Sequence, residues 1–350
     1  MTYRFDTPFF LFGMGGRQKL LYKNGALICC ETARPHRTFD ILSEEILAPE
    51  YTVRMTTAMG TVTVSEDEVG VHLTDEAGQT ETLTASPVHL PDFAGHPYRD
   101  AMRILTHDIL INVIDGRPVP NFIVYKKPWY RDGAMMAMVL RRTGNLGLIL
   151  DWVRSLDEMY DHNNAGVSES DNLGQLLYLL AVTGCTDHPL IDRVIEEAKS
   201  RLEDGVLTGQ CDYAPHPVYQ TKWLKYGLEA LGRDSSFLRI PEVSDGYSGL
   251  FWMDGHTEPY SGDYCENYPY LSWAQAHSAG FAMDAAHMEA LKHPVYPISS
   301  ETWASEAIYE NLRPLLPAYA DAHCSAPHTW HAAELFLYLD DLYAAEKAEG

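Results

Sequence analysis

Hydrophobic and polar residues alternate along the first part of the chain. Over residues 51–85, Val, Thr and Leu alternate with polar residues, and clusters of Gly, Asp, Glu and Ser interrupt the pattern. Asn24-Gly25 stands between two apolar runs, a common signal for a β-hairpin. This period-two alternation is typical of antiparallel strands with one face in water. It predicts a small antiparallel β domain over residues 1–95.

From residue 98 onward, apolar residues recur with the period of an α-helix. Tight turns alternate with long loops rich in Tyr, Asp, His and Gly, which favours helical hairpins stacked in a ring. A plain bundle would share the helices but would need fewer such loops. We therefore expect a mostly α fold, in which residues 96–350 form a complete or incomplete toroid of helical hairpins. The expected helices cover residues 98–114, 133–143, 146–159, 172–183, 189–203, 217–231, 266–286, 301–313 and 329–346.

The charge of the chain narrows the range of partners. There are 26 Lys and Arg against 49 Asp and Glu, a net charge of −23. Nucleic-acid binding depends on Lys and Arg that neutralise phosphates, and anionic membranes attract basic segments. The charge therefore argues against nucleic-acid and membrane partners and favours a small or neutral substrate. It leaves the oligomeric state open.

The N-terminal residues and the cysteines predict a compartment. The first residues lack a basic stretch, and Pro8 and Gly13 interrupt their apolar run too early for a secretion signal. No run of 18 or more residues is uniformly apolar, and the six cysteines include no C-x-x-C pair. We expect a cytoplasmic protein with reduced thiols, and neither a metal nor another cofactor.

The first chemistry-bearing cluster contains Trp129, Arg131 and Asp132, just ahead of an apolar helix. An indole can stack on the apolar face of a sugar, while a guanidinium and a carboxylate bind neighbouring hydroxyls. The alternative is that Asp132 caps the helix and Arg131 forms a surface ion pair. If Arg131 pairs with Asp132, that carboxylate stays ionised and suits substrate binding better than acid catalysis.

Two further clusters begin the next long helices. Glu169 and Asp171 precede an apolar helix, where either could cap the helix or face a pocket. Asp212 precedes a helix on which Tyr219, Lys222 and Trp223 share one face. Here the alternative is an aromatic packing stripe beside a lysine whose charged end reaches solvent.

Two clusters lie nearer the C-terminus. Glu266 and Trp273 belong to an expected helix start that follows an aromatic loop. His328, Trp330 and Glu334 belong to the start of the last expected helix. A second histidine follows His328 by one turn, but no third ligand is spaced to complete a metal site. Capping and buried aromatic packing are the alternatives for both clusters.

Four of these segments together resemble one family. Residues 129–133 (WYRDG) resemble the W-x-R-D segment of glucoamylase-type six-hairpin glycosidases, and residues 169–178 are similar to their E-x-D-x-x-G-x-x-L-(W/Y) helix start. Residues 219–223 resemble the Y-x-x-x-W helix, and residues 327–334 the P-x-T-W-x-x-A-E helix. The resemblance implies a divergent member of this (α/α)6-barrel superfamily, with the Arg-Asp pair holding the sugar and Asp171 at the pocket floor.

The chain also departs from that pattern. About 250 helical residues are few for twelve helices, and the loop that should supply the catalytic acid offers only Asp212. The Glu-Gln segment that usually supplies the base is missing. Glucoamylase activity itself is therefore not supported. A divergent glycosidase or a protein that has lost activity fits better.

Glycosidic cleavage needs one carboxylic acid and one carboxylate on opposite sides of the bond. We expect the pair to come from Asp171, Asp212 and Glu266, which stand on three loops, with inversion as the outcome implied by the resemblance. The substrate would be a small or oligomeric carbohydrate. The expected substrate-binding residues are Trp129, Arg131, Asp132, Glu169, Tyr219, Lys222, Trp223, Trp273, His328, Trp330 and Glu334.

Three other functions remain open. A uronide-processing lyase or hydrolase of the same barrel class could use Tyr219 and His216 for proton transfer and Arg131 to neutralise the uronate. A sugar isomerase of that class would use histidines as acid and base. A non-catalytic carbohydrate-binding protein would have aromatic platforms without two carboxylates at catalytic separation.

Overall fold

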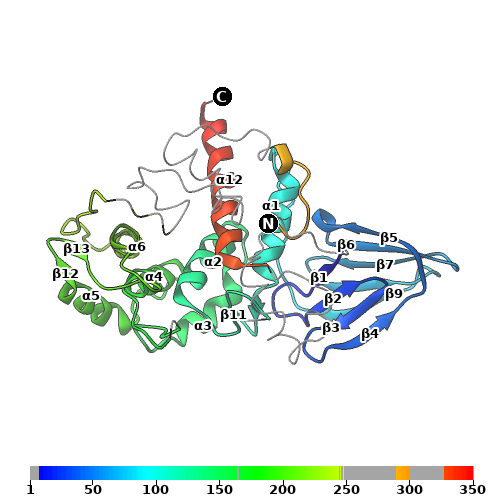
Figure 1. The fold of residues 1–350 in the computed structure, drawn as a ribbon, viewed down its shortest axis with the longest axis horizontal. Coiled ribbons are helices and arrows are strands. Elements are labelled where there is room, and N and C mark those ends of the chain that lie inside the picture. The colour runs from blue at the N-terminus through cyan, green and yellow to red at the C-terminus, as the bar shows by residue number, and fades with distance from the viewer. Residues whose placement is uncertain are drawn as a thin grey trace.

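The computed structural model describes residues 8–123, 125–163, 165–243, 245, 247, 289–298 and 327–349. Two antiparallel sheets form one end of the molecule, and helices form the other (Figure 1). The four-stranded sheet has the order β1 (Phe10–Phe12), β2 (Leu20–Lys23), β3 (Ala26–Cys29), β4 (Arg34–Thr38). The five-stranded sheet has the order β5 (Ile41–Leu47), β6 (Thr52–Thr57), β7 (Thr61–Glu66), β8 (Gly70–Thr74), β9 (Thr80–Ala85).

The β region forms where the alternation predicts it. Asn24 and Gly25 join β2 to β3, with φ angles of 47° and 73°, the left-handed pair that a tight hairpin turn requires. In β6, Val53 and Met55 are buried, while Arg54 between them is exposed. Residues of both sheets belong to one apolar cluster, which also includes residues of the first helix. The antiparallel N-terminal region is therefore confirmed, whereas the division at residue 95 stays a prediction.

The seven α-helices of the described residues begin and end near their predicted bounds, with one exception. The segment predicted at 146–159 forms a 3₁₀ turn (Leu146–Ile149) and the short α3. The segments predicted at 266–286 and 301–313 lie outside the described residues. The helices are α1 (Arg99–Leu110), α2 (Tyr130–Arg142), α3 (Leu150–Arg154), α4 (Asp171–Val182), α5 (Leu190–Ser200), α6 (Pro217–Ala230) and α12 (Thr329–Glu349).

The expected (α/α) barrel is wrong. Helix α6 packs on α4, α4 on α2, α2 on α12 and α12 on α1, so these five of the seven described helices form a row beside the two sheets and not a helical barrel (Figure 1). Helical periodicity shows which face of each helix is apolar, but it does not specify how many neighbours share that face. Two small hairpins begin where the predicted helices 98–114 and 189–203 were expected to end: β10 (Val113–Ile114) with β11 (Arg117–Pro118), and β12 (Leu202–Glu203) with β13 (Val206–Leu207).

Helices α4 and α6 approach each other closely enough for their backbones to touch. A Cβ atom at Gly174 would overlap the backbone of Trp223 and Leu224, and one at Gly227 would overlap the carbonyl oxygen of Gly174. Trp223 is fully buried at this crossing and packs edge-on against Tyr219. The contact fixes the start of α4 relative to the start of α6.

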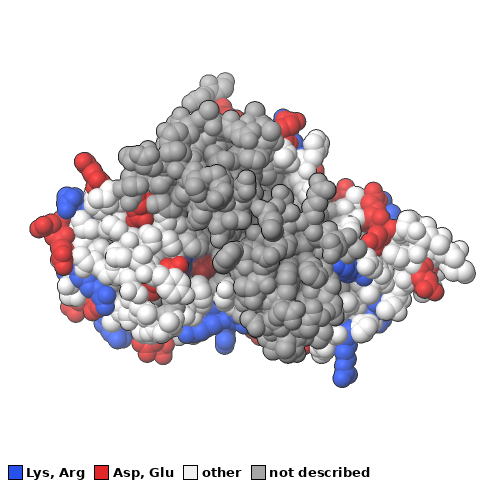
Figure 2. Space-filling view, in the orientation of Figure 1, with Lys and Arg blue, Asp and Glu red and all other residues white. Residues whose placement is uncertain are grey.

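The described surface shows acidic and basic side chains interspersed on the face drawn in Figure 2. Within the described ranges, no helix combines the length and the apolar character needed to cross a membrane. No disulfide joins any two of the described cysteines, which are Cys29, Cys30, Cys185 and Cys211.

Candidate functional site

Arg131 is the centre of the candidate site. It lies in the first turn of α2 and is 3% exposed. Its Nε donates to Asp171 Oδ2 at 3.0 Å, and its Nη2 donates to Glu169 Oε1 at 2.9 Å. Nη2 also lies 3.3 Å from the sulfur of Cys211. We call Arg131, Glu169, Asp171 and Cys211 the Arg131 cluster.

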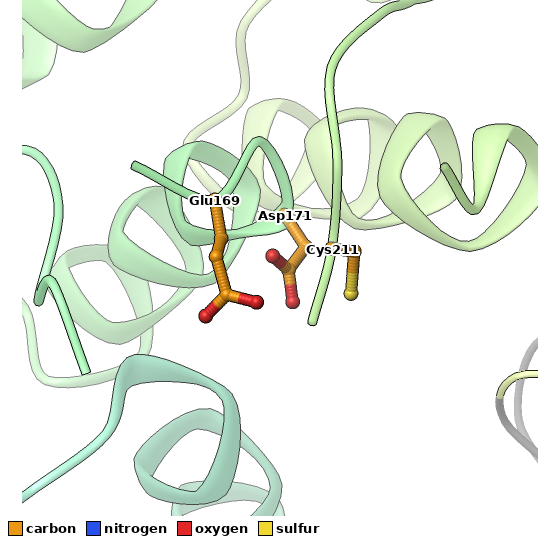
Figure 3. Close-up of side chains that lie close together, drawn as sticks. All are labelled: Glu169, Asp171 and Cys211. Atoms are coloured by element: carbon orange, nitrogen blue, oxygen red, sulfur yellow. The ribbon is translucent and has the colours of Figure 1, made fainter. Parts of the chain in front are cut away.

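The start of α4 is held in place by the segment 208–212. Ser170 donates from its backbone N–H to Gln210 O at 2.9 Å and from its hydroxyl to Thr208 O at 2.7 Å. The backbone N–H of Asp212 donates to the Glu169 carboxylate. The side chains of Glu169 and Asp171 therefore leave the helix toward the same side, with Cys211 beside them (Figure 3). The residue at the N-cap of α4 is Ser170, whose side chain makes no capping hydrogen bond to the helix.

Two buried carboxylates in this cluster share one guanidinium. Burial raises the pKa of Glu169, and the neighbouring charge of Asp171 raises it further, while Arg131 only partly opposes the shift. Burial alone would lower the pKa of Arg131, but Asp171, Cys211, Tyr247 and Tyr219 together outweigh burial and raise it well above the usual range. Burial also raises the pKa of the Cys211 thiol, so the thiol keeps its proton. Burial thus favours the protonated form of Glu169.

Aromatic rings cover the guanidinium. Tyr247 lies with its ring centre 5.2 Å from the guanidinium carbon of Arg131, and Trp330 of α12 lies at 5.7 Å. The two rings are 5.0 Å apart, and Tyr219 of α6 lies 4.9 Å from Tyr247. Segments distant in sequence thus form one aromatic wall beside the Arg131 cluster.

Three buried polar atoms at this wall have no hydrogen-bond partner among the described residues. They are Asp171 Oδ1, Tyr247 OH and Trp330 Nε1. Buried polar atoms in folded proteins are almost always paired, because an unpaired one loses its hydration without compensation. One acceptor, one hydroxyl and one N–H donor beside aromatic faces form a set that a polyhydroxylated ligand can satisfy.

Asp132 is hydrogen-bonded to Thr329, and the Arg-Asp sugar clamp implied by the resemblance stays a prediction. Its Oδ1 accepts a hydrogen bond from the hydroxyl of Thr329 at 3.0 Å, which ties α2 to the start of α12. Burial raises the pKa of Asp132, and the charges of His328 and Arg131 only partly oppose this. Asp132 does not cap α2 either, because Asp161 accepts the first helical N–H, that of Tyr130, at 2.6 Å.

A histidine–carboxylate pair lies next to the aromatic wall. His216 Nδ1 lies 2.9 Å from Asp245 Oδ1, and the ring of His216 stacks on Tyr247 at 4.1 Å. Asp245 Oδ2 accepts the backbone N–H groups of Val218 and Tyr219 at the start of α6. Burial works to raise the pKa of Asp245, but the hydrogen bonds from His216 and the backbone outweigh burial and lower it. The carboxylate is therefore ionised and orients the imidazole.

The remaining predicted residues occupy varied environments. Trp129 is half-buried with its ring 5.4 Å from Tyr125, and Lys222 is half-buried on α6. His328 is buried against His331, with ring centres 4.7 Å apart, and Glu334 is fully buried. Glu266 and Trp273 lie outside the described residues. Trp223 lies in the α4–α6 core, where packing accounts for it.

The Arg131 cluster contains donor atoms that a metal ion can use. The ligand atoms of Glu169, Asp171 and Cys211 lie within 4.8 Å of one another. However, the guanidinium of Arg131 already donates to an oxygen of each carboxylate. A divalent cation there would meet a fixed positive charge, so we assign charge neutralisation in this cluster to Arg131.

No spacing in the sequence indicates Asp245, Tyr247 or Asp161. Asp245 and Tyr247 follow α6 in the sequence, and the only available signal was the aromatic and acidic composition of that segment. Asp161 acts from outside the helix that it caps, so no local pattern indicates its role.

The chain was compared with known proteins. No protein family model matches it, and neither a curated protein nor a solved structure matches it. The glycosidase resemblance therefore stays a prediction from sequence, and the function must be argued from the site itself.

Proposed function

We propose that the protein binds a carbohydrate beside the Arg131 cluster and acts on it as a glycoside hydrolase-like enzyme. The observation that carries the proposal is the aromatic wall of Tyr247 and Trp330 over Arg131, whose OH and Nε1, like Asp171 Oδ1, are buried without a hydrogen-bond partner among the described residues. Sugars combine apolar faces, which stack on aromatic rings, with hydroxyls that both donate and accept hydrogen bonds.

The carboxylates of the cluster can serve different roles. Asp171 is held by Arg131 and Gln175, which donates to Oδ2 at 2.8 Å, so its other oxygen is fixed in one position. Glu169 and Asp171 both bind the same guanidinium, and their ligand oxygens lie within 4.8 Å. This is shorter than the roughly 6.5–9.5 Å that an intervening water needs in inverting hydrolysis. We therefore place both on one side of the sugar and assign the opposite carboxyl to Asp212 or Glu266.

The test is hydrolysis of a panel of aryl-glycosides, with the product anomer followed by NMR. We expect Asp171→Asn and one of Asp212→Asn and Glu266→Gln to lower kcat by about 10²–10⁴-fold. Asp187→Asn, at an exposed carboxylate in the turn after α4, is the matched control and should keep full activity. Full activity in all three site variants would reject the assignment. Sugar binding by calorimetry without turnover would instead establish a non-catalytic binding protein.

One observation favours a second candidate, a uronide lyase. His216, oriented by ionised Asp245 and stacked on Tyr247, resembles a proton-abstracting pair beside a tyrosine. Arg131, however, is engaged by two carboxylates and is poorly suited to neutralising a uronate. A lyase would release an unsaturated product that absorbs in the ultraviolet, and His216→Gln would abolish that signal. Hydrolysis would produce no such absorbance.

A further inference from the structure

A cavity in the described part of the chain shares no lining residue with the Arg131 cluster. It has a volume of about 270 Å³, close to the lower end of small-molecule sites. Its wall combines the glycine-rich segment after β1, the end of the β3 strand and the turn of the β10–β11 hairpin, which lies on the side of the sheets that faces the helices (Figure 1). Phe122 and Ile123 supply an apolar part of the wall.

Arg17 lines this cavity and is 3% exposed. Its Nη1 donates to Glu66 at 2.8 Å, and its Nε donates to Ser86 O at 2.8 Å. Its Nη2 is buried and has no hydrogen-bond partner among the described residues. Glu66 is held in turn by the backbone N–H groups of Gly13 and Met14, so the guanidinium is fixed in position with one donor group unused.

Lys19 lines the same cavity and is 6% exposed. Its ammonium donates to the carbonyl oxygens of Gly13 and Gly15, the latter at 2.7 Å. An ammonium has three donors, and the described residues supply acceptors for two of them. Two adjacent basic groups, both held by the protein, thus keep unused donors at one cavity.

The charged residues at the rim of the cavity determine which further groups a ligand needs besides the anionic one. Lys126 adds a third cation, while Glu31 and Asp115 add carboxylates. A purely anionic ligand would be repelled by these carboxylates, whereas hydroxyl groups could donate to them. Three cations at one cavity are unusual in a chain with a net charge of −23.

We propose that this cavity binds a small organic molecule with one phosphate or carboxylate group and additional hydroxyl groups. Arg17 and Lys19 hold the oxyanion, Lys126 attracts it at the rim, and the hydroxyls face Glu31 and Asp115. Arginine and lysine together form charge-assisted hydrogen bonds to such groups, which are stronger than those between neutral partners.

The electrostatics of Lys19 agree with this assignment. Burial lowers its pKa to about 7, against the opposing charges of Glu66, Cys30 and Asp115 and together with the repulsion from Arg17. The ammonium is therefore only partly protonated near neutral pH, and a bound anion would favour the protonated form. We expect tighter binding at pH 6 than at pH 8.

Calorimetric titration tests the proposal without sugars that could bind elsewhere. Glycerol 3-phosphate supplies the phosphate form, glycerate the carboxylate form, and glycerol is the uncharged control. We expect saturable binding of at least one anion and none of glycerol. Lys19→Met and Lys126→Gln should weaken binding by about tenfold or more, whereas Lys127→Gln, at the exposed neighbouring lysine, should not.

The outcomes separate the alternatives. Whichever of the two anions binds identifies the oxyanion. If Lys19→Met does not fold, Lys126→Gln alone decides the result. The proposal is overturned if neither anion binds, if glycerol binds equally well, or if Lys126→Gln binds as tightly as Lys127→Gln. Asp171→Asn should leave this binding unchanged, because the Arg131 cluster shares no residue with the cavity.

Discussion

Arg131 and Asp171 are joined by a buried ion pair at 3.0 Å, although 40 residues separate them along the chain. The pair links the first turn of α2 to the first residue of α4. Glu169, which lies just before α4, also pairs with Arg131. The same contact therefore positions both the helices and the carboxylates of the proposed sugar site.

Arg131→Met removes the cation and leaves two buried carboxylates without it. We expect the free energy of unfolding to fall by about 3–5 kcal/mol at pH 7. Burial already raises the pKa of Glu169, and loss of the opposing charge of Arg131 should raise it further. Stability is therefore lost as the pH rises through this pKa, so the defect should be smaller at pH 5. Urea unfolding followed by circular dichroism at both pH values measures this.

Arg154→Met is the control for this substitution. Arg154 pairs with Asp151 at 3.6 Å, but both side chains are largely exposed, at 61% and 100%. Exposed pairs of this kind contribute little to stability. Equal losses in the two variants, or no pH dependence for Arg131→Met, would contradict the role assigned to Arg131.

Thr329→Val removes the hydroxyl that donates to Asp132. Because burial already raises the pKa of Asp132, loss of this hydrogen bond should raise it further. We expect stability to fall by about 1–2 kcal/mol at pH 7. The loss should shrink on acidification, since a protonated Asp132 no longer carries a buried charge. Thr329→Ser keeps the hydroxyl and should behave like the wild type in thermal unfolding, both at pH 7 and at acidic pH.

Gly174→Ala tests the α4–α6 crossing. In an isolated helix alanine is more favourable than glycine by about 1 kcal/mol, but here its Cβ would overlap the backbone of Trp223 and Leu224. Backbone atoms cannot move aside as a flexible side chain can, so we expect a net loss of about 2–3 kcal/mol. Gly147→Ala has nothing within 4 Å of its Cβ and should cause no loss. Similar midpoints of urea unfolding for the two variants would show that the crossing tolerates a methyl group.

The sequence predicted the elements well and their assembly poorly. The Asn24-Gly25 hairpin and the helices starting near Arg99 and Thr329 follow from local turn chemistry and apolar spacing. The predicted barrel is wrong, because the arrangement of the helices in a row depends on contacts between distant segments, such as that of Gly174 with Gly227.

The same limit applies to the candidate site. The spacing predicted that Arg131, Glu169 and Asp171 bear the chemistry, and the structure brings these three together. Spacing could not show that Asp132 turns toward Thr329, since two adjacent residues in a first helical turn point in different directions. Nor could it supply Asp245, whose interaction with His216 crosses 29 positions.

Lys19→Met isolates the effect of burying an ammonium at the cavity lined by Arg17 and Lys19. Burial lowers the pKa of Lys19 to about 7, against 10.5 for an unperturbed lysine. Between these two values the unfolded chain binds more protons than the folded one, so the wild type should gain stability relative to the variant as the pH rises. The gain should approach 1.4 kcal/mol per pH unit at most, and on the order of 4 kcal/mol in total. Urea unfolding of both proteins at pH 7, 8, 9 and 10 gives the difference directly, and Lys127→Met at an exposed position should show a flat difference. If the free energies of unfolding of the wild type and Lys19→Met changed with pH in the same way, the folded protein would keep Lys19 protonated throughout this pH range.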